Sequence, residues 1–151
     1  MEPVPPVTPH LAVSNAAAAI EFYKKAFGAE ETERHLAPGT AKIMHARLLV
    51  NGGVVMLSDD FSAEFGGESS TPEALGGSPV TLHLNLSDVD AFWERAVEAG
   101  AIVTMPLKDQ FWGDRYGQLK DPFGHKWALG QKKKELSAAE LAEAAKQAFK
   151  M

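Results

Sequence analysis

Hydrophobic and polar residues alternate along two stretches of the chain, residues 7–13 and 80–86. In both stretches the leucines and valines fall on one side, and a histidine, His10 or His83, falls on the other. A period of two residues is typical of a strand with one buried face. We therefore predict a strand in each stretch, with a polar face that is left to line a site.

A helical pattern follows each predicted strand. Apolar residues recur at helical spacing, at Ala16, Ile20, Tyr23 and Phe27 and again at Val89, Phe92, Trp93 and Ala96. Ser14 or Asn15 can cap the first helix, and Asp88 can cap the second. Gly28 and Gly100 can end them, because glycine accepts the left-handed conformation found after many helices. Each helix is expected to cover the apolar face of the strand before it.

Three further strands are predicted in each half of the chain. The candidates are residues 31–35, 41–50 and 54–58, and then residues 102–105, 115–120 and 125–129. The sequence Asn51-Gly52-Gly53 indicates a tight hairpin. Residues 61–79 are rich in Gly, Ser and Glu and are interpreted as a mobile loop or lid. Ser137 and Glu140 form a capping-box pattern that predicts a terminal helix.

The two halves are related in sequence. Residues 7–15 align with residues 80–88 at an offset of 73, and five of the nine positions are identical. The similarity continues more weakly through both helices to a Gly-Ala pair at the end of each. A unit that is repeated twice predicts a pseudo-twofold domain.

Composition limits the classes of function. The 151 residues include no cysteine, which excludes a disulfide scaffold, a thiolate zinc site and a cysteine nucleophile. A net charge of −5 without a long basic block argues against nucleic-acid binding. The longest apolar run is five residues, too short for a membrane span, and the first ten residues lack the pattern of a secretory signal. We expect a cytoplasmic protein that binds neither nucleic acid nor membrane.

Six short motifs lie within residues 19–127. They are AIEFY (19–23), FGA (27–29), DVDA (88–91), AGA (99–101), FWGDRYG (111–117) and DPFGHKW (121–127). With these motifs, residues 7–130 resemble the vicinal oxygen chelate superfamily of glyoxalases, extradiol dioxygenases and bleomycin-binding proteins. The last two motifs and a terminal helix beginning at ELS (135–137) are similar to its PhnB-like branch.

The resemblance implies an α+β fold. Two tandem βαβββ modules would form a curved, mostly antiparallel sheet with a central cavity, followed by a C-terminal helix. The expected single domain spans residues 1–151. It comprises module 1 at about 7–60, the loop at 61–79, module 2 at about 80–130 and the helix at about 137–149. Because relatives pair two chains to complete their cavities, the resemblance also implies a homodimer.

Members of this superfamily usually hold a metal ion with His, Gln or Glu on four strands. The matching positions in this chain are Thr8, Thr81, Met56 (or its neighbour Leu57) and Ala128. None of these side chains is a ligand for a divalent cation in such a site. We therefore expect no metal and no cofactor. A displaced metal at His10 and His83, completed by Asp59 or Asp60, is the less favoured alternative.

Six residues are candidates for a ligand-binding site. His10 and His83 share the polar strand faces, and the hairpin register pairs His45 with Tyr116 across the repeat. Trp112 and Arg115 lie in a Gly-flanked aromatic segment suited to a planar or anionic molecule. For Arg115 an ion pair with an acid is an equal alternative, and for the histidines a role in lining the cavity is favoured over chemistry. His35 and His125 have no partner that suggests chemistry.

Two functions of different class follow. The favoured one is a metal-independent protein that binds a small organic molecule, with His, Trp and Arg lining the cavity. The alternative is a lyase, isomerase or dioxygenase of glyoxalase type that uses a displaced metal, or His10 and His83 as acid and base. Whether the chain is an enzyme, which residues would be catalytic and which ligand it binds are left open.

Overall fold

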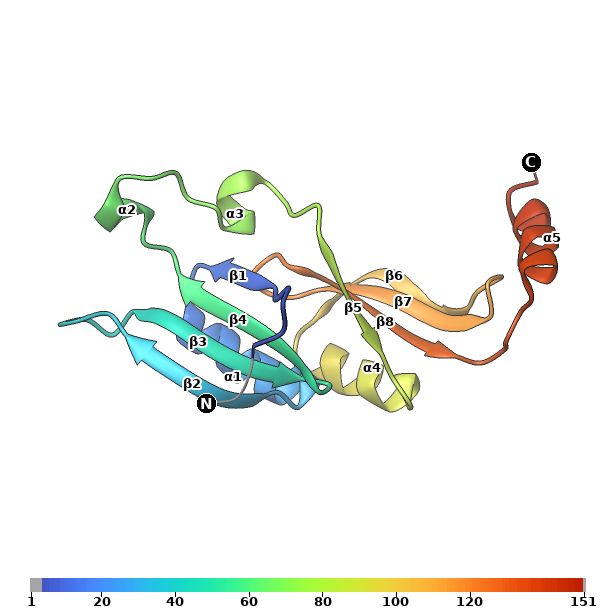
Figure 1. The fold of residues 1–151 in the computed structure, drawn as a ribbon, viewed down its shortest axis with the longest axis horizontal. Helices are drawn as coiled ribbons and strands as arrows, with labels where there is room; N and C mark the ends of the chain where they lie inside the picture. The colour runs from blue at the N-terminus through green and yellow to red at the C-terminus, as the bar shows by residue number, and fades with distance from the viewer. Residues whose placement is uncertain (1–3, 151) are drawn as a thin grey trace.

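Each half of the chain folds as a strand, a helix and three more strands in the computed structural model, which describes residues 4–150 (Figure 1). The first half comprises β1 (His10–Val13), α1 (Ala16–Phe27), β2 (Glu30–Leu36), β3 (Ile43–Val50) and β4 (Gly53–Asp59). The second comprises β5 (Thr81–Asn85), α4 (Val89–Glu98), β6 (Ile102–Asp109), β7 (Asp114–Lys120) and β8 (Lys126–Lys132). The α+β fold of two βαβββ modules is therefore confirmed.

The strands form two four-stranded sheets, one from each module. Their orders are β1-β4-β3-β2 and β5-β8-β7-β6. The first strand of each module runs parallel to the last, and the other neighbours are antiparallel. Among residues 4–150 no strand of one sheet pairs with a strand of the other. The repeat predicts each module but not whether their edges join, because edge pairing depends on how the modules pack.

The tight hairpin between β3 and β4 agrees with its sequence. Asn51 and Gly52 have φ values of 51° and 80°, so both adopt the left-handed conformation. A two-residue turn with two positive φ angles matches the twist of the flanking strands. This turn fixes the register that places alternate side chains of both strands on the same sheet face.

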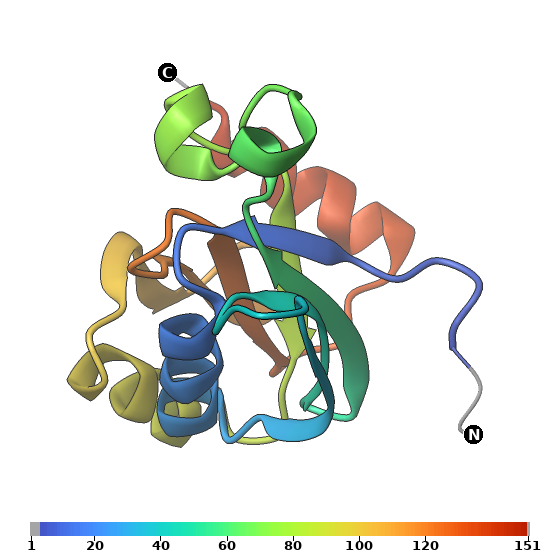
Figure 2. The same ribbon diagram turned by 90° about the vertical axis from the view of Figure 1, so that its left-hand side faces the viewer.

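The two long helices, α1 and α4, lie side by side and join the modules (Figure 2). Phe27 of α1 stacks on Phe92 of α4 with ring centroids 5.5 Å apart, and it lies 4.7 Å from Trp127 of β8. The Tyr23 hydroxyl donates to the carboxylate of Asp121, which is 1% exposed. The two modules are therefore packed through aromatic rings, and the buried carboxylate of Asp121 lies among these rings.

Residues 61–79, interpreted as a loop, contain two short helices. These are α2 (Ser62–Phe65) and α3 (Pro72–Leu75). The Thr71 side chain caps α3 by accepting from the Ala74 amide, and proline occupies the first helical position. A helix of four residues is too short to show a helical period in the sequence, so the surrounding glycines and serines led to the interpretation as a loop.

The terminal helix α5 (Ala138–Ala148) begins with the predicted capping box. The Ser137 hydroxyl accepts from the Glu140 amide, and the Glu140 carboxylate accepts from the Ser137 amide. No residue of α5 is buried, and the helix stands apart from both sheets at one end of the molecule (Figure 1). No helix within residues 4–150 is long and apolar enough to cross a membrane.

Candidate functional site

One face of each sheet is covered by helices and the other is open. In the first module Ala46 and Leu57 pair across the strands and are fully buried, so the neighbouring His45 and Ser58 face the open side. In the second, Gly117 and Leu129 pair in the same way, which places Tyr116 on the open side. The register confirms that His45 and Tyr116 are equivalent in the repeat.

A row of three imidazoles crosses the open face of the first sheet. The Nε2 atom of His10 lies 3.1 Å from the Ser58 hydroxyl oxygen, within hydrogen-bond distance. The ring of His45 is 6.2 Å from that of His10 and 6.1 Å from that of His35. Burial, and secondly the charge of His45, lower the pKa of His10 below its usual value. Neutral His10 is therefore favoured at pH 7.

A carboxylate and a guanidinium lie beside the middle imidazole of this row. The Glu33 carboxylate lies 3.7 Å from His45 Nε2 and 3.6 Å from Arg47 Nε. Arg47 is only 8% exposed, and its Nε forms no hydrogen bond with the described residues. The first sheet therefore offers a polar surface with a carboxylate and a guanidinium close to His45.

The open face of the second sheet is aromatic. The His83 ring stacks on Tyr116 at 5.8 Å, and Tyr116 makes an edge contact with Trp112 at 5.3 Å. Gly130 lies beneath the first two rings, where a Cβ atom would come within 3.3 Å of His83 Cε1 and 3.5 Å of Tyr116 Cδ2. The absence of a side chain at Gly130 lets both rings rest close to the sheet.

Hydrogen bonds fix the orientation of these rings. His83 Nε2 lies 3.1 Å from Asn85 Oδ1, and Gln118 Nε2 donates to the Tyr116 hydroxyl at 2.9 Å. The Trp112 indole N–H donates to Asp114 at 3.1 Å. A flat aromatic surface with polar groups at its margin can stack on a planar molecule and bind its oxygen atoms.

The predicted site residues fall into separate groups. His10 and His45 belong to the first sheet, while His83, Trp112 and Tyr116 form one contact chain on the second. The contact partners of His10 and His83 are different in every case. The structure of one chain therefore does not bring the two candidate acid–base histidines together.

Arg115 lies on the opposite face of β7 from Tyr116. Its Nε donates to Asp90 of α4 at 2.9 Å, and its Nη1 donates to Asp109 at 3.3 Å. The side chain points toward the helix because neighbouring residues of a strand alternate in direction. Arg115 therefore forms ion pairs with two acids, as the alternative interpretation expected, and it does not contact the aromatic residues of the open face.

A groove of about 360 Å³ runs between the first strands of the modules. His10 and Leu82 line it from the two sides, and His125 at one edge has its Nε2 atom 2.9 Å from the Ala12 carbonyl oxygen. Since the carbonyl can only accept, the His125 Nε2–H donates. His125 thus ties the modules together, a role that its sequence context did not reveal.

The four family positions for metal ligands do not fit a metal ion. Met56 lies opposite His10 in the strand register, and Ala128 lies opposite His83. Thr8 precedes β1 and donates its hydroxyl to the Pro5 carbonyl. Within residues 4–150, no three His, Asp or Glu side chains are grouped closely enough to hold a metal ion.

The family is decided by comparison with known proteins. The sequence model of the Glyoxalase/Bleomycin resistance protein/Dioxygenase superfamily matches residues 5–129. The chain belongs to this superfamily.

Similar proteins are found in several bacteria. The uncharacterized protein Rv0887c of Mycobacterium tuberculosis is 53% identical over 137 residues, covering 91% of this chain and 80% of the relative. The crystal structure of PA1353 from Pseudomonas aeruginosa is 30% identical with a TM-score of 0.64, over 83% of this chain and 96% of that one. The PhnB protein of Bacillus cereus shares the fold with a TM-score of 0.64 at 20% identity, over 84% and 99%.

Three residues of the open faces were missed in the sequence. Ser58 and Gln118 each lie two residues from a position that was considered, so strict alternation along β4 and β7 would have found them. Gly130 lies two residues after Ala128 on the same face of β8. Two small residues on one strand face indicate that another group packs close to the backbone there.

Proposed function

We propose that this superfamily member binds a small organic molecule with a planar, oxygen-bearing part, and that it does so without the metal ligands usual in its family. The observation that carries the proposal is the aromatic surface of His83, Tyr116 and Trp112 above Gly130. Its rings are held by hydrogen bonds before any ligand arrives, which lowers the entropic cost of binding.

We also propose that two copies pair and that pairing supplies the second wall of the site. Both open sheet faces are polar or aromatic, and within residues 4–150 they belong to two different sheets. A symmetric pair can place the imidazole row of one copy opposite the aromatic surface of the other. A PhnB-like membership within the superfamily and a cytoplasmic location stay predictions from the sequence.

The test is a melting-temperature screen of the purified protein with soluble bicyclic aromatic carboxylates and phenols. A compound present at 100 times its Kd adds about 2.7 kcal/mol of stability, which raises the Tm by roughly 5–11 °C for a chain of this size. The shift is expected to disappear in His83→Ala and to shrink in Gly130→Ala, which displaces the rings but keeps them. Leu75→Ala, at an exposed position of α3, is the matched control.

Two results would overturn this function. One is a screen in which no compound shifts the Tm of the parent protein. The other is a shift that survives in the His83→Ala and Tyr116→Ala variants, since binding would then lie elsewhere.

Metal analysis of the same protein separates binding from glyoxalase-type catalysis. One equivalent of tightly held Zn, Ni, Mn or Fe that is lost in His10→Ala or His83→Ala would contradict the binding-only function. A protein that retains no metal after dialysis, together with the ligand-dependent Tm shift, would support it.

A further inference from the structure

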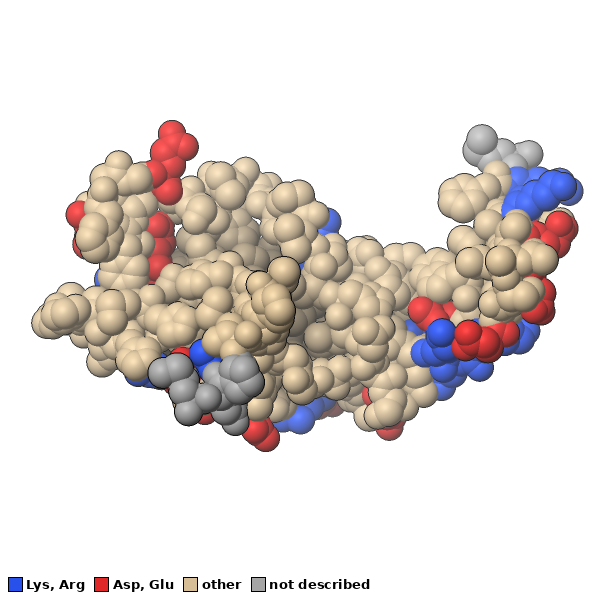
Figure 3. Space-filling model, in the orientation of Figure 1, with Lys and Arg blue, Asp and Glu red and all other residues tan. Residues whose placement is uncertain are grey.

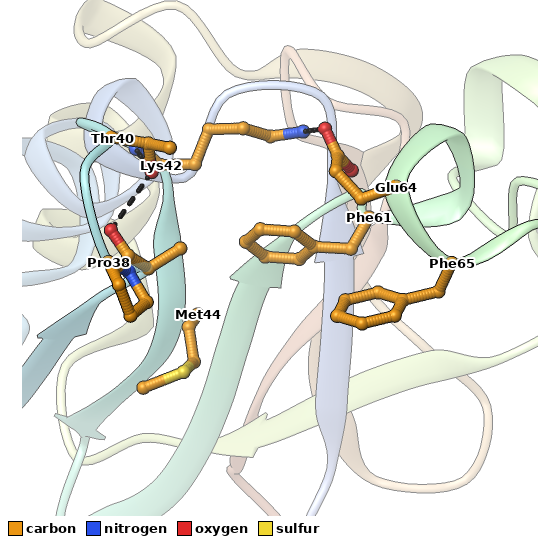
Figure 4. Close-up of a pocket in the computed structure, with 8 residues that line it drawn as sticks. Pro38, Thr40, Lys42, Met44, Phe61, Glu64 and Phe65 are labelled. Carbon is orange, nitrogen blue, oxygen red and sulfur yellow. Dashed lines mark hydrogen bonds and ion pairs between the residues drawn. The ribbon is translucent and has the colours of Figure 1, made fainter.

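A second groove, of about 540 Å³, lies at the far end of the first sheet beneath α2 (Figure 4). Its walls are the turn between β2 and β3, the start of β3 and the segment that carries α2. The lining includes Pro38, Met44, Phe61 and Phe65. Phe65 is 85% exposed and Met44 is 50% exposed, so this apolar surface is open to solvent.

The polar groups at the rim of this groove already have partners. The Lys42 ammonium donates to the Asp60 carbonyl and to the Glu64 carboxylate, both at 2.8 Å. It also lies 4.7 Å from the centre of the Phe61 ring, within range of a cation–π interaction. What the groove still offers to an occupant is therefore apolar area, not hydrogen bonds.

The terminal helix α5 exposes apolar side chains that could fill such a groove. Its apolar stripe ends in Phe149, which is 77% exposed, and Leu141 on the same helix is 39% exposed. A helix with an apolar stripe and no buried residue requires a partner surface, because helices of this length are marginal alone in water. Within its own chain the contact of Phe149 is the edge of the Phe111 ring, at 6.0 Å.

The charges of the two surfaces are complementary. Residues 59–79 contain five acids and no lysine or arginine, whereas residues 132–150 contain five lysines and three glutamates. In Figure 3, red atoms gather over the α2 end of the molecule, whereas the α5 end carries both blue and red atoms, with lysines outnumbering glutamates. Opposite charges steer two such surfaces together and favour one orientation.

We propose that the groove beneath α2 is the docking site for α5 of a second copy of this chain. The groove and α5 lie at opposite ends of the long axis (Figure 1). A twofold axis perpendicular to the long axis brings each α5 to the groove of the other copy, so the contact forms twice. The proposal rests on the pairing of two copies and is independent of which ligand they bind.

The absence of cysteine from the chain allows a direct test by cross-linking. Phe65→Cys protein is mixed with Phe149→Cys protein and treated with a short bismaleimide. Each variant carries one cysteine, so a covalent pair that contains both variants reports contact between two copies of the chain. Either variant alone, and Ile102→Cys mixed with Phe149→Cys, are the controls and should give little product.

A second experiment measures the dimer dissociation constant of the full chain carrying Phe149→Asp, by sedimentation or light scattering over a dilution series. Burial of one phenylalanine is worth about 1.5–3 kcal/mol and the contact occurs twice, so the dimer dissociation constant should rise at least ~100-fold. Leu75→Asp, on the neighbouring α3, should leave it unchanged.

Each outcome has one meaning. Preferential cross-linking of the mixed pair, with weakened dimers in Phe149→Asp, supports the docking site. A dimer that gives no mixed product overturns this proposal and leaves the pairing in place. A chain that is monomeric at micromolar concentration overturns both the docking site and the pairing, while the ligand screen judges binding separately.

Discussion

The buried carboxylate of Asp121 provides the sharpest test of how the modules are held together. It accepts four hydrogen bonds, from the Tyr23 hydroxyl, the Trp127 indole N–H at 2.9 Å, and the amides of Phe123 and His125 at 2.9 and 3.0 Å. Burial, and secondly the charge of Asp121, raise the pKa of Tyr23 well above its usual value, so the tyrosine stays a donor.

Asp121→Ala leaves two buried donors, on Tyr23 and Trp127, without an acceptor. An unsatisfied buried donor costs roughly 1–3 kcal/mol, and the two turn amides lose a charged acceptor as well. We expect a loss of about 3–5 kcal/mol, a large part of the 5–15 kcal/mol that stabilises most domains. The corresponding fall in Tm is roughly 6–20 °C for a chain of this size.

Urea unfolding, followed by tryptophan fluorescence and circular dichroism, measures this loss. Asp121→Asn has nearly the same volume but one acceptor oxygen in place of two, so it should also be destabilised, by about 2–4 kcal/mol. Tyr23→Phe removes one donor and keeps the ring, and should cost about 1 kcal/mol. If Asp121→Asn unfolds within about 0.5 kcal/mol of the parent, the four bonds do not hold this turn and the reasoning is refuted.

Two further predictions concern the covered and the open sheet faces. Gly117→Ala should cost about 1–3 kcal/mol in urea unfolding, because its Cβ would lie 2.6 Å from the ring of Trp93; an unchanged midpoint would contradict this packing. His10 should titrate below pH 6.5 by NMR, and His45→Ala should raise its pKa only in part, since burial is the larger cause. A pKa lowered on folding means that His10 contributes stability above pH 6.5, and that this contribution is lost as the pH falls through the folded-state value. Titration of His10 at or above its ordinary value would contradict the burial of its ring.

The module fold and its repeat could be predicted from the sequence because both depend on local pattern. Alternation along residues 7–13 and 80–86 fixed which side chains share a face, and the hairpin at Asn51 fixed the strand register. The same alternation correctly paired His45 with Tyr116. These properties follow from the two-residue period of a strand, which needs no knowledge of the partner element.

The composition of the site required the tertiary structure. Arg115 and Tyr116 are neighbours in β7 and so lie on opposite faces of the strand, but only the fold shows that Asp90 of α4 binds the arginine. His10 and His83 are equivalent in the repeat, but they remain on separate sheets because α1 and α4 pack side by side.

By itself the sequence determined two copies of one βαβββ module and the alternation of polar and apolar side chains along their first strands. Only the tertiary structure decided that the sheets stay separate, that Asp121 joins the modules, and that α5 stands away from its own chain. The physical reason is range: strand and helix periods are set by neighbours along the chain, whereas module packing is set by contacts such as Tyr23 with Asp121, 98 residues apart.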